Sequence, residues 1–367
     1  MFFFYLLYLL YFSISLFLYF CSPMKYSRVC LHTPGYALPP NEVTSADIEA
    51  RLAPVYKRLK LPEGRLELMS GIAARRFWHA GTRPSDGATL AGRDAMARAG
   101  VNAGELECLI FASVCRDMME PATAAFVHRR LGLPERCQIF DLSNACLGFL
   151  NGMIMLANMI ELGQVKKGIV VAGETAESLV DSTITHLLQD TTLTRKSIKP
   201  AFASLTIGSG AVALVMESRE SNDTGHYLAG GACRANTSHN DLCQGGLPGQ
   251  GGVLMATDSE QLLQQGVETA ARCWQDFQTE LGRRQADIDR FFCHQVGRAH
   301  AHLLFETLGL DAAKNFETLA MFGNVGSVSA PLTMAMGIEQ QVLKAGERAA
   351  LLGIGSGINS LMLGIDW

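Results

Sequence analysis

The most constraining feature of this sequence is a repeat, in which one order of strands, helices and loops occurs twice. In the first half these are a strand at 109–114, a helix ending at Leu131, a strand at 138–141, the loop Asn144-Ala-Cys146 and an apolar helix at 152–162. In the second half they are a strand at 291–296, a helix ending at Leu308, a strand at 316–319, the loop Phe322-Gly-Asn324 and a further helix. Such long-period self-similarity indicates two related units.

The two halves also agree in spacing. Cys146 follows Leu131 by 15 residues and Asn324 follows Leu308 by 16, so the two residues occupy equivalent loops that each open a central helix. His294 ends a strand in the second half. Alternating strands and helices predict helices layered on mainly parallel sheets. We expect an α/β fold with halves at 24–220 and 221–367, in which these three polar side chains meet where the halves pack together.

Composition excludes several classes of function. A net charge of −4 and a pI near 6.2 argue against a nucleic-acid partner, which usually requires an excess of basic residues. The ten cysteines form no Cys-x-x-Cys pair and no Cys/His pattern with zinc spacing, so no metal site is expected. Most of the thiols are expected to be reduced and buried in a cytosolic protein. The glycine-rich stretch 245–252 lacks the Lys-Ser/Thr of a phosphate-binding loop and is interpreted as a mobile loop between the halves.

Residues 1–23 form an almost wholly aliphatic and aromatic leader, and the first charge is Lys25. The leader is long enough for a membrane span, which takes about 20 apolar residues. Because Lys25 and Arg28 follow it directly, such a span would leave the rest of the chain on the cytoplasmic side. We favour the alternative that the leader is translated upstream sequence, because the segment from Met24 to Cys30 is typical of a first strand. In both cases the globular part is expected in the cytoplasm.

Cys146 is the candidate nucleophile. It precedes a predicted helix, and the positive end of a helix dipole favours the reactive thiolate. Taken alone, Cys146 could be a buried structural cysteine, His294 a core histidine and Asn324 a turn residue. Their matching places in the repeat favour catalysis, because a thiol with an imidazole and a carboxamide combines a nucleophile with proton-handling and hydrogen-bonding groups.

A second glycine-rich turn, Gly353-Ile-Gly-Ser356-Gly-Ile-Asn359, lies near the C-terminus. Its glycines allow a close approach of the backbone. The backbone N–H groups of Ser356 and Cys146 could together form an oxyanion hole for a thioester addition intermediate. The alternative is a tight bend after the last core strand.

Four segments resemble the signature regions of the thiolase superfamily, and within it the 3-oxoacyl-ACP synthase III branch. They are Asp141-Leu-Ser-Asn-Ala-Cys-Leu-Gly-Phe149, Cys293-His-Gln-Val296, Phe322-Gly-Asn-Val-Gly326 and Gly353-Ile-Gly-Ser-Gly357, and the resemblance runs from Met24 to Trp367. It implies a homodimer of five-layered αβαβα subunits, each made of two related halves. It further implies that Cys146 is acylated beside His294 and Asn324, with an oxyanion hole at Cys146 and Ser356. No cofactor is implied, since coenzyme A thioesters are substrates.

Within this branch the sequence is most similar to the head-to-head acyl-CoA condensing enzymes of olefin synthesis (OleA-type). The similarity lies in Ser113-Val-Cys-Arg-Asp-Met-Met-Glu120-Pro and in the segment 71–78. In that group the glutamate reaches in from the partner subunit and removes a proton alpha to a thioester. Apolar surroundings such as Met118 and Met119 would raise the pKa of Glu120 and suit it to this role. A plain loop glutamate at a helix start is the alternative.

The resemblance therefore implies a Claisen condensation of two fatty acyl-CoA molecules to a 2-alkyl-3-oxoacyl product or its beta-keto acid, with olefin-pathway enzymes downstream. One alternative is a decarboxylating 3-oxoacyl-ACP synthase III that joins an acyl-CoA primer to malonyl-ACP. The other is a non-catalytic binding protein with the same fold. Arg75, Arg76 and Arg298 are candidates for contacts with coenzyme A phosphates, since guanidinium groups suit phosphate; ordinary surface arginines are the alternative.

Overall fold

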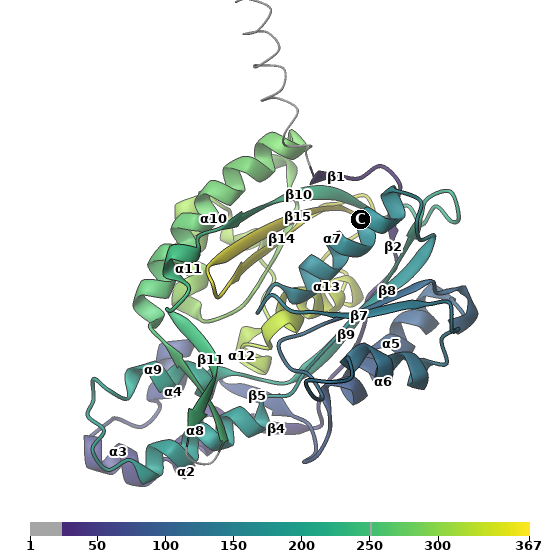
Figure 1. Ribbon diagram of the computed structural model, residues 1–367. Helices are drawn as coiled ribbons and strands as arrows, with labels where there is room; N and C mark the ends of the chain where they lie inside the picture. Colours follow the sequence, from purple (N-terminus) through teal and green to yellow (C-terminus); the bar gives the residue numbers. More distant parts are fainter. Residues whose placement is uncertain (1–23, 250–251) are drawn as a thin grey trace, which may run out of the picture.

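The structure is a computed structural model that describes residues 24–249 and 252–367 (Figure 1). The leader predicted at 1–23 lies outside the described residues. Within the described ranges, no helix combines the length and the apolar character needed to cross a membrane.

Most strands belong to one 11-stranded sheet, in the order β13-β14-β15-β10-β2-β9-β8-β6-β7, with β1 paired to β10 and β3 paired to β9. The strands of this sheet are β1 (Met24–Lys25), β2 (Val29–Leu31), β3 (Gly35–Ala37), β6 (Cys108–Ala112), β7 (Gln138–Leu142), β8 (Lys167–Glu174), β9 (Gly210–Ser218), β10 (Tyr227–Ala235), β13 (Arg290–Cys293), β14 (Arg348–Gly355) and β15 (Asn359–Asp366). The pairs β4 (Asn41–Thr44) with β5 (Ala74–Phe77) and β11 (Cys243–Gly249) with β12 (Gly252–Thr257) form two separate small sheets.

The predicted repeat is visible in the pairing of the strands. In the first half β6 is parallel to β8, which is antiparallel to β9, which is antiparallel to β2. In the second half β13, β14, β15 and β10 pair in the same order and with the same directions. The two halves join where β10 pairs with β2. We expected a mainly parallel sheet, but the sheet is mixed. In the first half β9 and β2 run antiparallel to their neighbours, and in the second half β15 and β10 do so.

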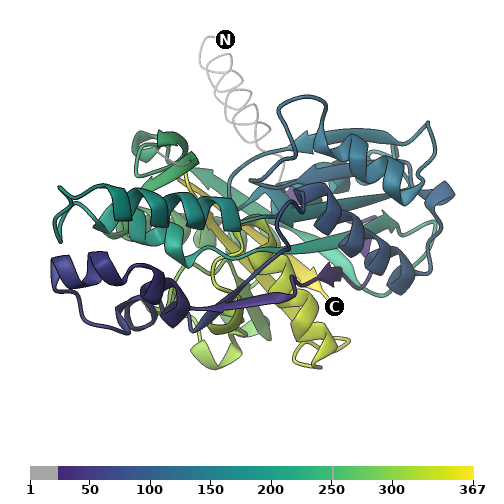
Figure 2. The same cartoon turned by 90° about the horizontal axis from the view of Figure 1, so that it is seen from below.

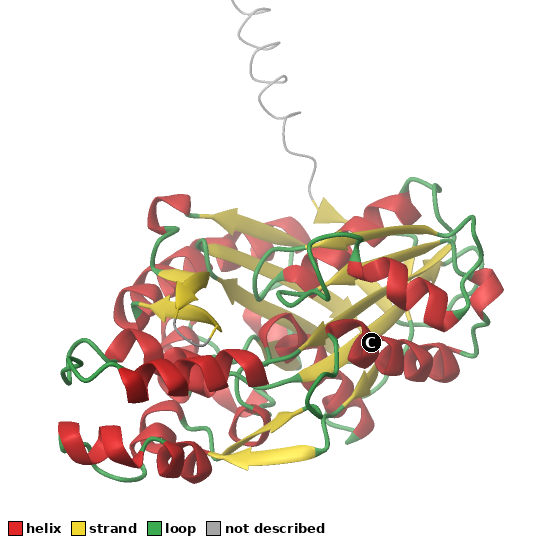
Figure 3. Ribbon diagram, turned by 60° about the horizontal axis from the view of Figure 1, so that its bottom comes forward, coloured by secondary structure: helices red, strands yellow, loops and turns green. Residues whose placement is uncertain are grey.

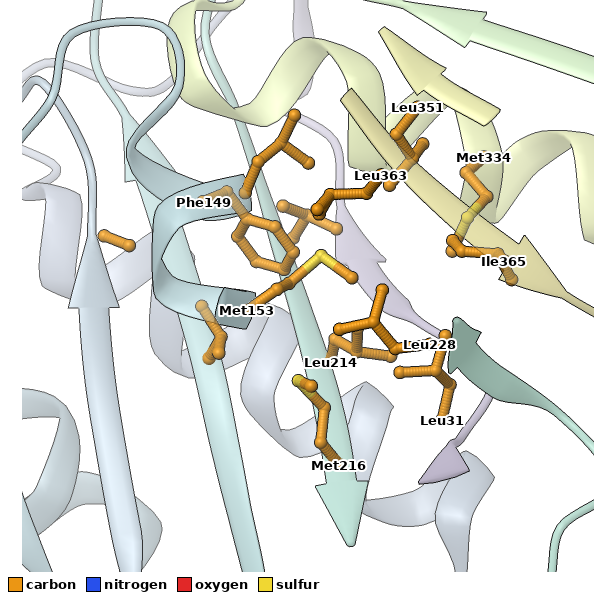
Figure 4. Close-up of a cluster of buried hydrophobic side chains, with 14 of the residues drawn as sticks. Leu31, Phe149, Met153, Leu214, Met216, Leu228, Met334, Leu351, Leu363 and Ile365 are labelled. Atoms are coloured by element: carbon orange, nitrogen blue, oxygen red, sulfur yellow. The ribbon is translucent and has the colours of Figure 1, made fainter. Parts of the chain in front are cut away.

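Helices form three layers around the sheet halves (Figures 1 and 2). α5 (Pro84–Ala99) and α6 (Thr123–Leu131) cover the outer face of the first half, and α10 (Ser259–Leu281) and α11 (Arg298–Leu308) cover that of the second. α7 (Gly148–Glu161) and α13 (Ser329–Glu339) lie between the halves, where their apolar side chains form the largest core cluster (Figure 4). This arrangement is the expected five-layered αβαβα fold.

The alternation of side chains along each strand explains the layers. In β6, Leu109 and Phe111 pack toward α5 and α6, whereas Cys108, Ile110 and Ala112 pack toward α7. Successive side chains of a strand point to opposite faces, so a strand covered on both faces must be apolar throughout. The uninterrupted apolar strands of the sequence are therefore the ones that helices cover on both sides.

A lobe lies beside the layers, at the lower left of Figure 1. It contains β4, β5, α2 (Ser45–Arg51), α3 (Ala53–Leu59), α4 (Arg65–Ser70), α8 (Glu177–Gln189) and α9 (Lys199–Phe202). The lobe has its own core, which includes Ile48, Leu52, Phe77 and Leu187. The β11–β12 pair packs against α8 and α9 and stands apart from the main sheet (Figure 3).

Three local predictions differ from the structure. In the stretch 245–252, expected to be a loop, residues 245–249 belong to β11 and Gly252 begins β12, because glycine retains the backbone donors and acceptors that strands require. The expected strand at 316–319 is reduced to a single bridge between Phe291 and Asn315, followed by the short helix α12 (Leu319–Phe322). The expected first strand from Met24 is divided into β1 and β2.

Candidate active site

A cavity of about 940 Å³ lies at the junction of the two halves and the lobe. Cys146, His294, Asn324 and Ser356 all line it. The structure therefore brings together four predicted residues that come from four different loops of the sequence.

Cys146 lies in a sharp turn between β7 and α7. Ala145 has a φ of +47°, and the backbone N–H of Leu147 donates to Asn144 O at 3.0 Å. A left-handed φ is strained for a residue with a side chain, so packing must hold this turn in place. Part of that packing comes from Gly355, where an added Cβ would lie 3.0 Å from Leu147 Cγ. The turn places the thiol at the amino end of α7, as predicted.

The charge state of Cys146 differs from the prediction. Burial, and then the negative charges of Cys243 and Glu174, raise the pKa of the Cys146 thiol to about 12. In this cavity the loss of solvation outweighs the helix dipole, which contributes at most about 2 kcal/mol in partly buried sites. The resting thiol is therefore protonated at neutral pH, and a nearby group has to accept its proton before it can attack.

His294 follows β13 directly, and its backbone N–H donates to Leu352 O at 2.8 Å. Burial, reinforced by the charge of His300, lowers the pKa of His294 to about 4. Neither ring nitrogen has a hydrogen-bond partner among the described residues. His294 is therefore a neutral imidazole at the cavity with a free nitrogen that can accept a proton.

Asn324 is fixed through its backbone to the first half of the chain. Its N–H donates to Thr206 O at 3.0 Å, and its carbonyl accepts from the N–H of Gly208 at 2.9 Å. Gly208 is required there, since an added Cβ would lie 2.1 Å from Phe322 O. The side-chain Oδ1 accepts from Gly326 N–H at 3.0 Å, so the amide NH₂ is the end that remains for a ligand.

Ser356 follows β14 in a turn tied to the Cys146 loop. Asn359 Nδ2 donates to Ser356 O at 3.1 Å and to Asn144 Oδ1 at 3.4 Å. Asn144 in turn donates to Asn151 Oδ1 at 2.8 Å, within α7. These contacts hold the two proposed oxyanion-hole segments in one network.

Glu120 is not among the described residues that line the cavity. It is exposed on the loop between β6 and α6, and Met119 beside it is 95% exposed. The apolar surroundings expected from the two methionines are therefore incomplete in a single chain, because Met119 faces solvent and Met118 is 37% exposed.

The three arginine candidates have different surroundings. Arg75 is fully buried and donates to Val43 O and Ser45 Oγ, so it supports the junction of β4 with α2 and cannot reach a phosphate in solvent. Arg76 forms an ion pair with Glu42 at 3.3 Å. Arg298 is exposed at the first residue of α11, one position after Gly297, which lines the cavity. Of the three, only Arg298 is placed for an anionic ligand at the cavity.

Sequence reasoning missed several polar residues that line the same cavity. They are Cys115, Glu174, Cys243, Cys293 and His300. Glu174 could have been found from the sequence. It directly follows the apolar run 169–173, which predicts a carboxylate at the carboxyl end of a buried strand. The others carry no such signal, because a single Cys or His in an apolar segment is typical of ordinary core.

Comparisons with known proteins agree with this geometry. Residues 140–232 match the 3-oxoacyl-[acyl-carrier-protein] synthase III family, and residues 279–367 match the C-terminal region of that family. An acyl-CoA:acyl-CoA alkyltransferase of Shewanella oneidensis is 40% identical over 94% of this chain and all of the relative, and one of Xanthomonas campestris is 37% identical with the same coverage. A beta-ketoacyl-[acyl-carrier-protein] synthase III of Neisseria meningitidis is 26% identical over 91% of this chain and 97% of its own.

Solved structures agree as well. The Xanthomonas OleA bound to cerulenin has a TM-score of 0.89 at 36% identity and covers 94% of this chain and 98% of its own. A cysteine-to-serine variant of that protein with lauric acid and lauroyl-CoA has a TM-score of 0.89 at 35% identity and covers 93% of this chain and 100% of its own. The protein therefore belongs to the acyl-CoA:acyl-CoA alkyltransferase (OleA) family, carbon–carbon bond-forming acyltransferases of the thiolase superfamily.

Proposed function

We propose that this enzyme joins two fatty acyl-CoA molecules by a Claisen condensation through an acyl–Cys146 intermediate. The product is a 2-alkyl-3-oxoacyl thioester, or the beta-keto acid after hydrolysis, which olefin-pathway enzymes would take up in the cytoplasm. The observation that carries the proposal is the convergence of Cys146, His294, Asn324 and Ser356 on one cavity.

The first half-reaction loads the thiol. Neutral His294 accepts the proton of Cys146, and the thiolate attacks the thioester carbonyl of the first acyl-CoA. The backbone N–H groups of Cys146 and Ser356 stabilise the oxyanion. Collapse of this intermediate breaks the bond to coenzyme A, whose sulfur takes the proton from His294. Coenzyme A is the carrier, and the proposal requires no resident cofactor.

The second half-reaction forms the carbon–carbon bond. Glu120 of a second copy of this chain removes the alpha proton of the second acyl-CoA, and the carbanion attacks the Cys146 thioester. His294 and the NH₂ group of Asn324 stabilise the enolate oxygen. The Cys146–acyl bond breaks as the new bond forms, and the proton that Glu120 removed returns to the released Cys146 thiolate.

Three observations support a homodimer that delivers Glu120 to its partner. β7 is an edge strand of the main sheet, and an open edge can pair with another chain. The loop that carries Glu120 exposes Val114, Met118 and Met119. In the Xanthomonas OleA, solved structures replace a glutamate and a cysteine that are 26 residues apart, the same separation as between Glu120 and Cys146.

The cavity supports a substrate with long apolar chains. Its volume is near the upper end of the roughly 300–1,000 Å³ that ligand sites occupy. One wall contains Leu179, Val253 and Met255 from α8 and β12. Another contains Leu263, Val267 and Leu304 from α10 and α11. Two apolar walls suit two chains that meet at Cys146.

The test is incubation of the purified enzyme with myristoyl-CoA alone. We expect release of coenzyme A, a myristoyl adduct on Cys146 by mass spectrometry, and a beta-keto acid with two alkyl chains. Cys146→Ala should form neither the adduct nor the product. A wild-type enzyme that makes product only when malonyl-ACP is added would contradict the proposal and identify a decarboxylating synthase.

A further inference from the structure

Glu174 is a buried carboxylate at the centre of the site for which the mechanism above has no role. It ends β8, is only 3% exposed and lines the cavity beside Cys146. Its Oε1 accepts from Val114 N–H at 3.0 Å, Ser327 N–H at 3.2 Å and Ser327 Oγ at 2.7 Å, and its Oε2 accepts from Cys115 N–H at 3.0 Å.

These four donors belong to two loops from opposite halves of the chain. Val114 and Cys115 begin the loop that carries Glu120. Ser327 follows Asn324 by three residues, and Gly326 between them donates to Asn324 Oδ1 at 3.0 Å. Hydrogen bonds therefore link the Glu120 loop through the carboxylate to Ser327, and the backbone joins Ser327 to Gly326, which holds the Asn324 carboxamide.

The contact between Glu174 and the Asn324 loop leaves no room for another side chain. An added Cβ at Gly326 would lie 3.1 Å from Glu174 Oε1, and the φ of +55° there disfavours residues other than glycine. Farther along the Glu120 loop, Asp117 accepts from Ser85 N–H at 2.9 Å. The loop is therefore fixed at its start by Glu174 and midway by Asp117.

The residue at this position has to be a carboxylate. Four N–H and O–H donors converge on its two oxygens, and hydrogen bonds to an ionised acceptor are stronger than neutral ones. A glutamine would keep one acceptor oxygen and turn its own NH₂ toward one of the donors. In the part of the chain that the structure describes, Glu174 forms no ion pair, whereas the equally buried Glu217 pairs with His32 and Lys167. A buried carboxylate without a cation is costly unless hydrogen bonds compensate for the lost solvation, which the four donors do here.

We propose that Glu174 is a positioning residue for the condensation step, whose carboxylate fixes the Glu120 loop relative to the carboxamide of Asn324. In the proposed dimer, the Glu120 loop of one chain would reach the cavity of the partner, whereas the Asn324 carboxamide would act in the cavity of its own chain. This inference rests on the proposed function. We do not assign Glu174 as the base that removes the alpha proton, because both of its carboxylate oxygens already accept hydrogen bonds from the protein.

The two half-reactions separate this role from a general effect on folding. Acylation of Cys146 requires neither of the two loops that Glu174 joins, whereas carbon–carbon bond formation requires both. A positioning role predicts that loss of Glu174 slows condensation far more than acylation.

The charge of Glu174 supplies a second readout. Burial is the main cause that raises the pKa of Cys146, and the charges that add to it are those of Cys243 and Glu174. Removing the Glu174 charge should therefore lower the pKa of the thiol. Alkylation of Cys146 by iodoacetamide would then begin at lower pH than in the wild type.

The experiment compares Glu174→Gln with Glu217→Gln, which also removes a buried carboxylate, but one that does not line the cavity. Single-turnover acylation and condensation are measured with myristoyl-CoA, and alkylation of Cys146 is followed against pH by mass spectrometry. We expect Glu174→Gln to slow condensation by roughly 10- to 100-fold, as small misplacements of reacting groups do. Its acylation rate should stay close to that of the wild type, and its alkylation profile should shift to lower pH. Glu217→Gln should reproduce the wild type in all three measurements.

Ser327→Ala is a milder variant that removes the 2.7 Å hydrogen bond and keeps the charge. It should slow condensation less than Glu174→Gln does and leave the alkylation profile unchanged. Wild-type condensation in either Glu174→Gln or Ser327→Ala would overturn the inference, as would an equal loss of acylation and condensation. A wild-type enzyme that never forms the Cys146 adduct would instead overturn the proposed function.

Discussion

At the scale of single residues, the candidate site contains two side chains whose pKa values are shifted in opposite directions. Burial raises the pKa of Cys146 and lowers that of His294, so both groups are neutral at pH 7. A neutral thiol and a neutral imidazole that line the same cavity suit the proposed proton transfer as the thioester arrives. The sequence predicted that both residues would lie at one site, and both line the cavity, but it did not predict their charge state, because desolvation depends on walls contributed by residues far away in the chain.

This pair predicts how acylation depends on pH. The lowered pKa of His294 keeps the imidazole neutral down to about pH 4, so acylation should fall as the pH drops through about 4 rather than near 6.5, the pKa of an unperturbed histidine. His294→Ala removes the proton acceptor and should slow acylation by roughly 10²- to 10⁴-fold. The release of coenzyme A, followed by stopped flow, measures both the pH dependence of acylation and the rate loss in His294→Ala. Circular dichroism shows whether the protein stays folded. An inflection near pH 6.5 would contradict the assigned neutral state.

At the scale of elements, loops rather than strands hold the site, and glycines allow those loops to meet. The repeat in the sequence predicted where β6, β7 and β13 lie and which loops converge on the cavity. It did not predict that 206–208 runs beside Asn324, nor that 243–249 and 252–257 pair as antiparallel strands. The first contact joins distant parts of the chain, and the glycines of β11 leave no apolar alternation by which a strand could be recognised.

The contact between Gly208 and Phe322 provides a test at this scale. In Gly208→Ala the new Cβ would lie 2.1 Å from a backbone oxygen, so the segment with Asn324 must move. We expect a loss of about 1–3 kcal/mol in the free energy of unfolding, as for other overpacked sites, together with slower condensation. Gly104→Ala is the matched control, since nothing lies within 4 Å of its added Cβ. Urea unfolding and single-turnover assays measure the two effects, and equal stability of the two variants would refute the proposed contact.

At the scale of the whole molecule, a single chain brings the proposed nucleophile, Cys146, together with His294 and Asn324 at the cavity but leaves the proposed base outside it. The sequence, through the resemblance, indicated that Glu120 would come from a partner, and the structure of one chain places Glu120 at the surface away from the cavity. The strand pattern alone could not have revealed this, since it describes one chain and carries no information about a second.

Mixing two inactive variants tests the exchange between subunits. Cys146→Ala lacks the nucleophile and Glu120→Gln lacks the proposed base. If Glu120 serves the partner, a mixed dimer contains one complete site, so random exchange of subunits should restore about a quarter of wild-type condensation. If Glu120 serves its own chain, no complete site can form and the mixture stays inactive. Ultracentrifugation of each variant checks that both form the proposed dimer.

The lobe has a consequence of its own for how such an enzyme can diversify. One wall of the cavity comes from α8 and β12, which lie outside the five layers, whereas the thiol, the imidazole and the carboxamide come from loops of the layered frame. Substitutions in that wall can lengthen or shorten the space for a hydrocarbon tail while the reacting atoms keep their places. Evolution could therefore change the length of the accepted acyl chain through residues of α8 and β12 without altering the residues proposed for catalysis.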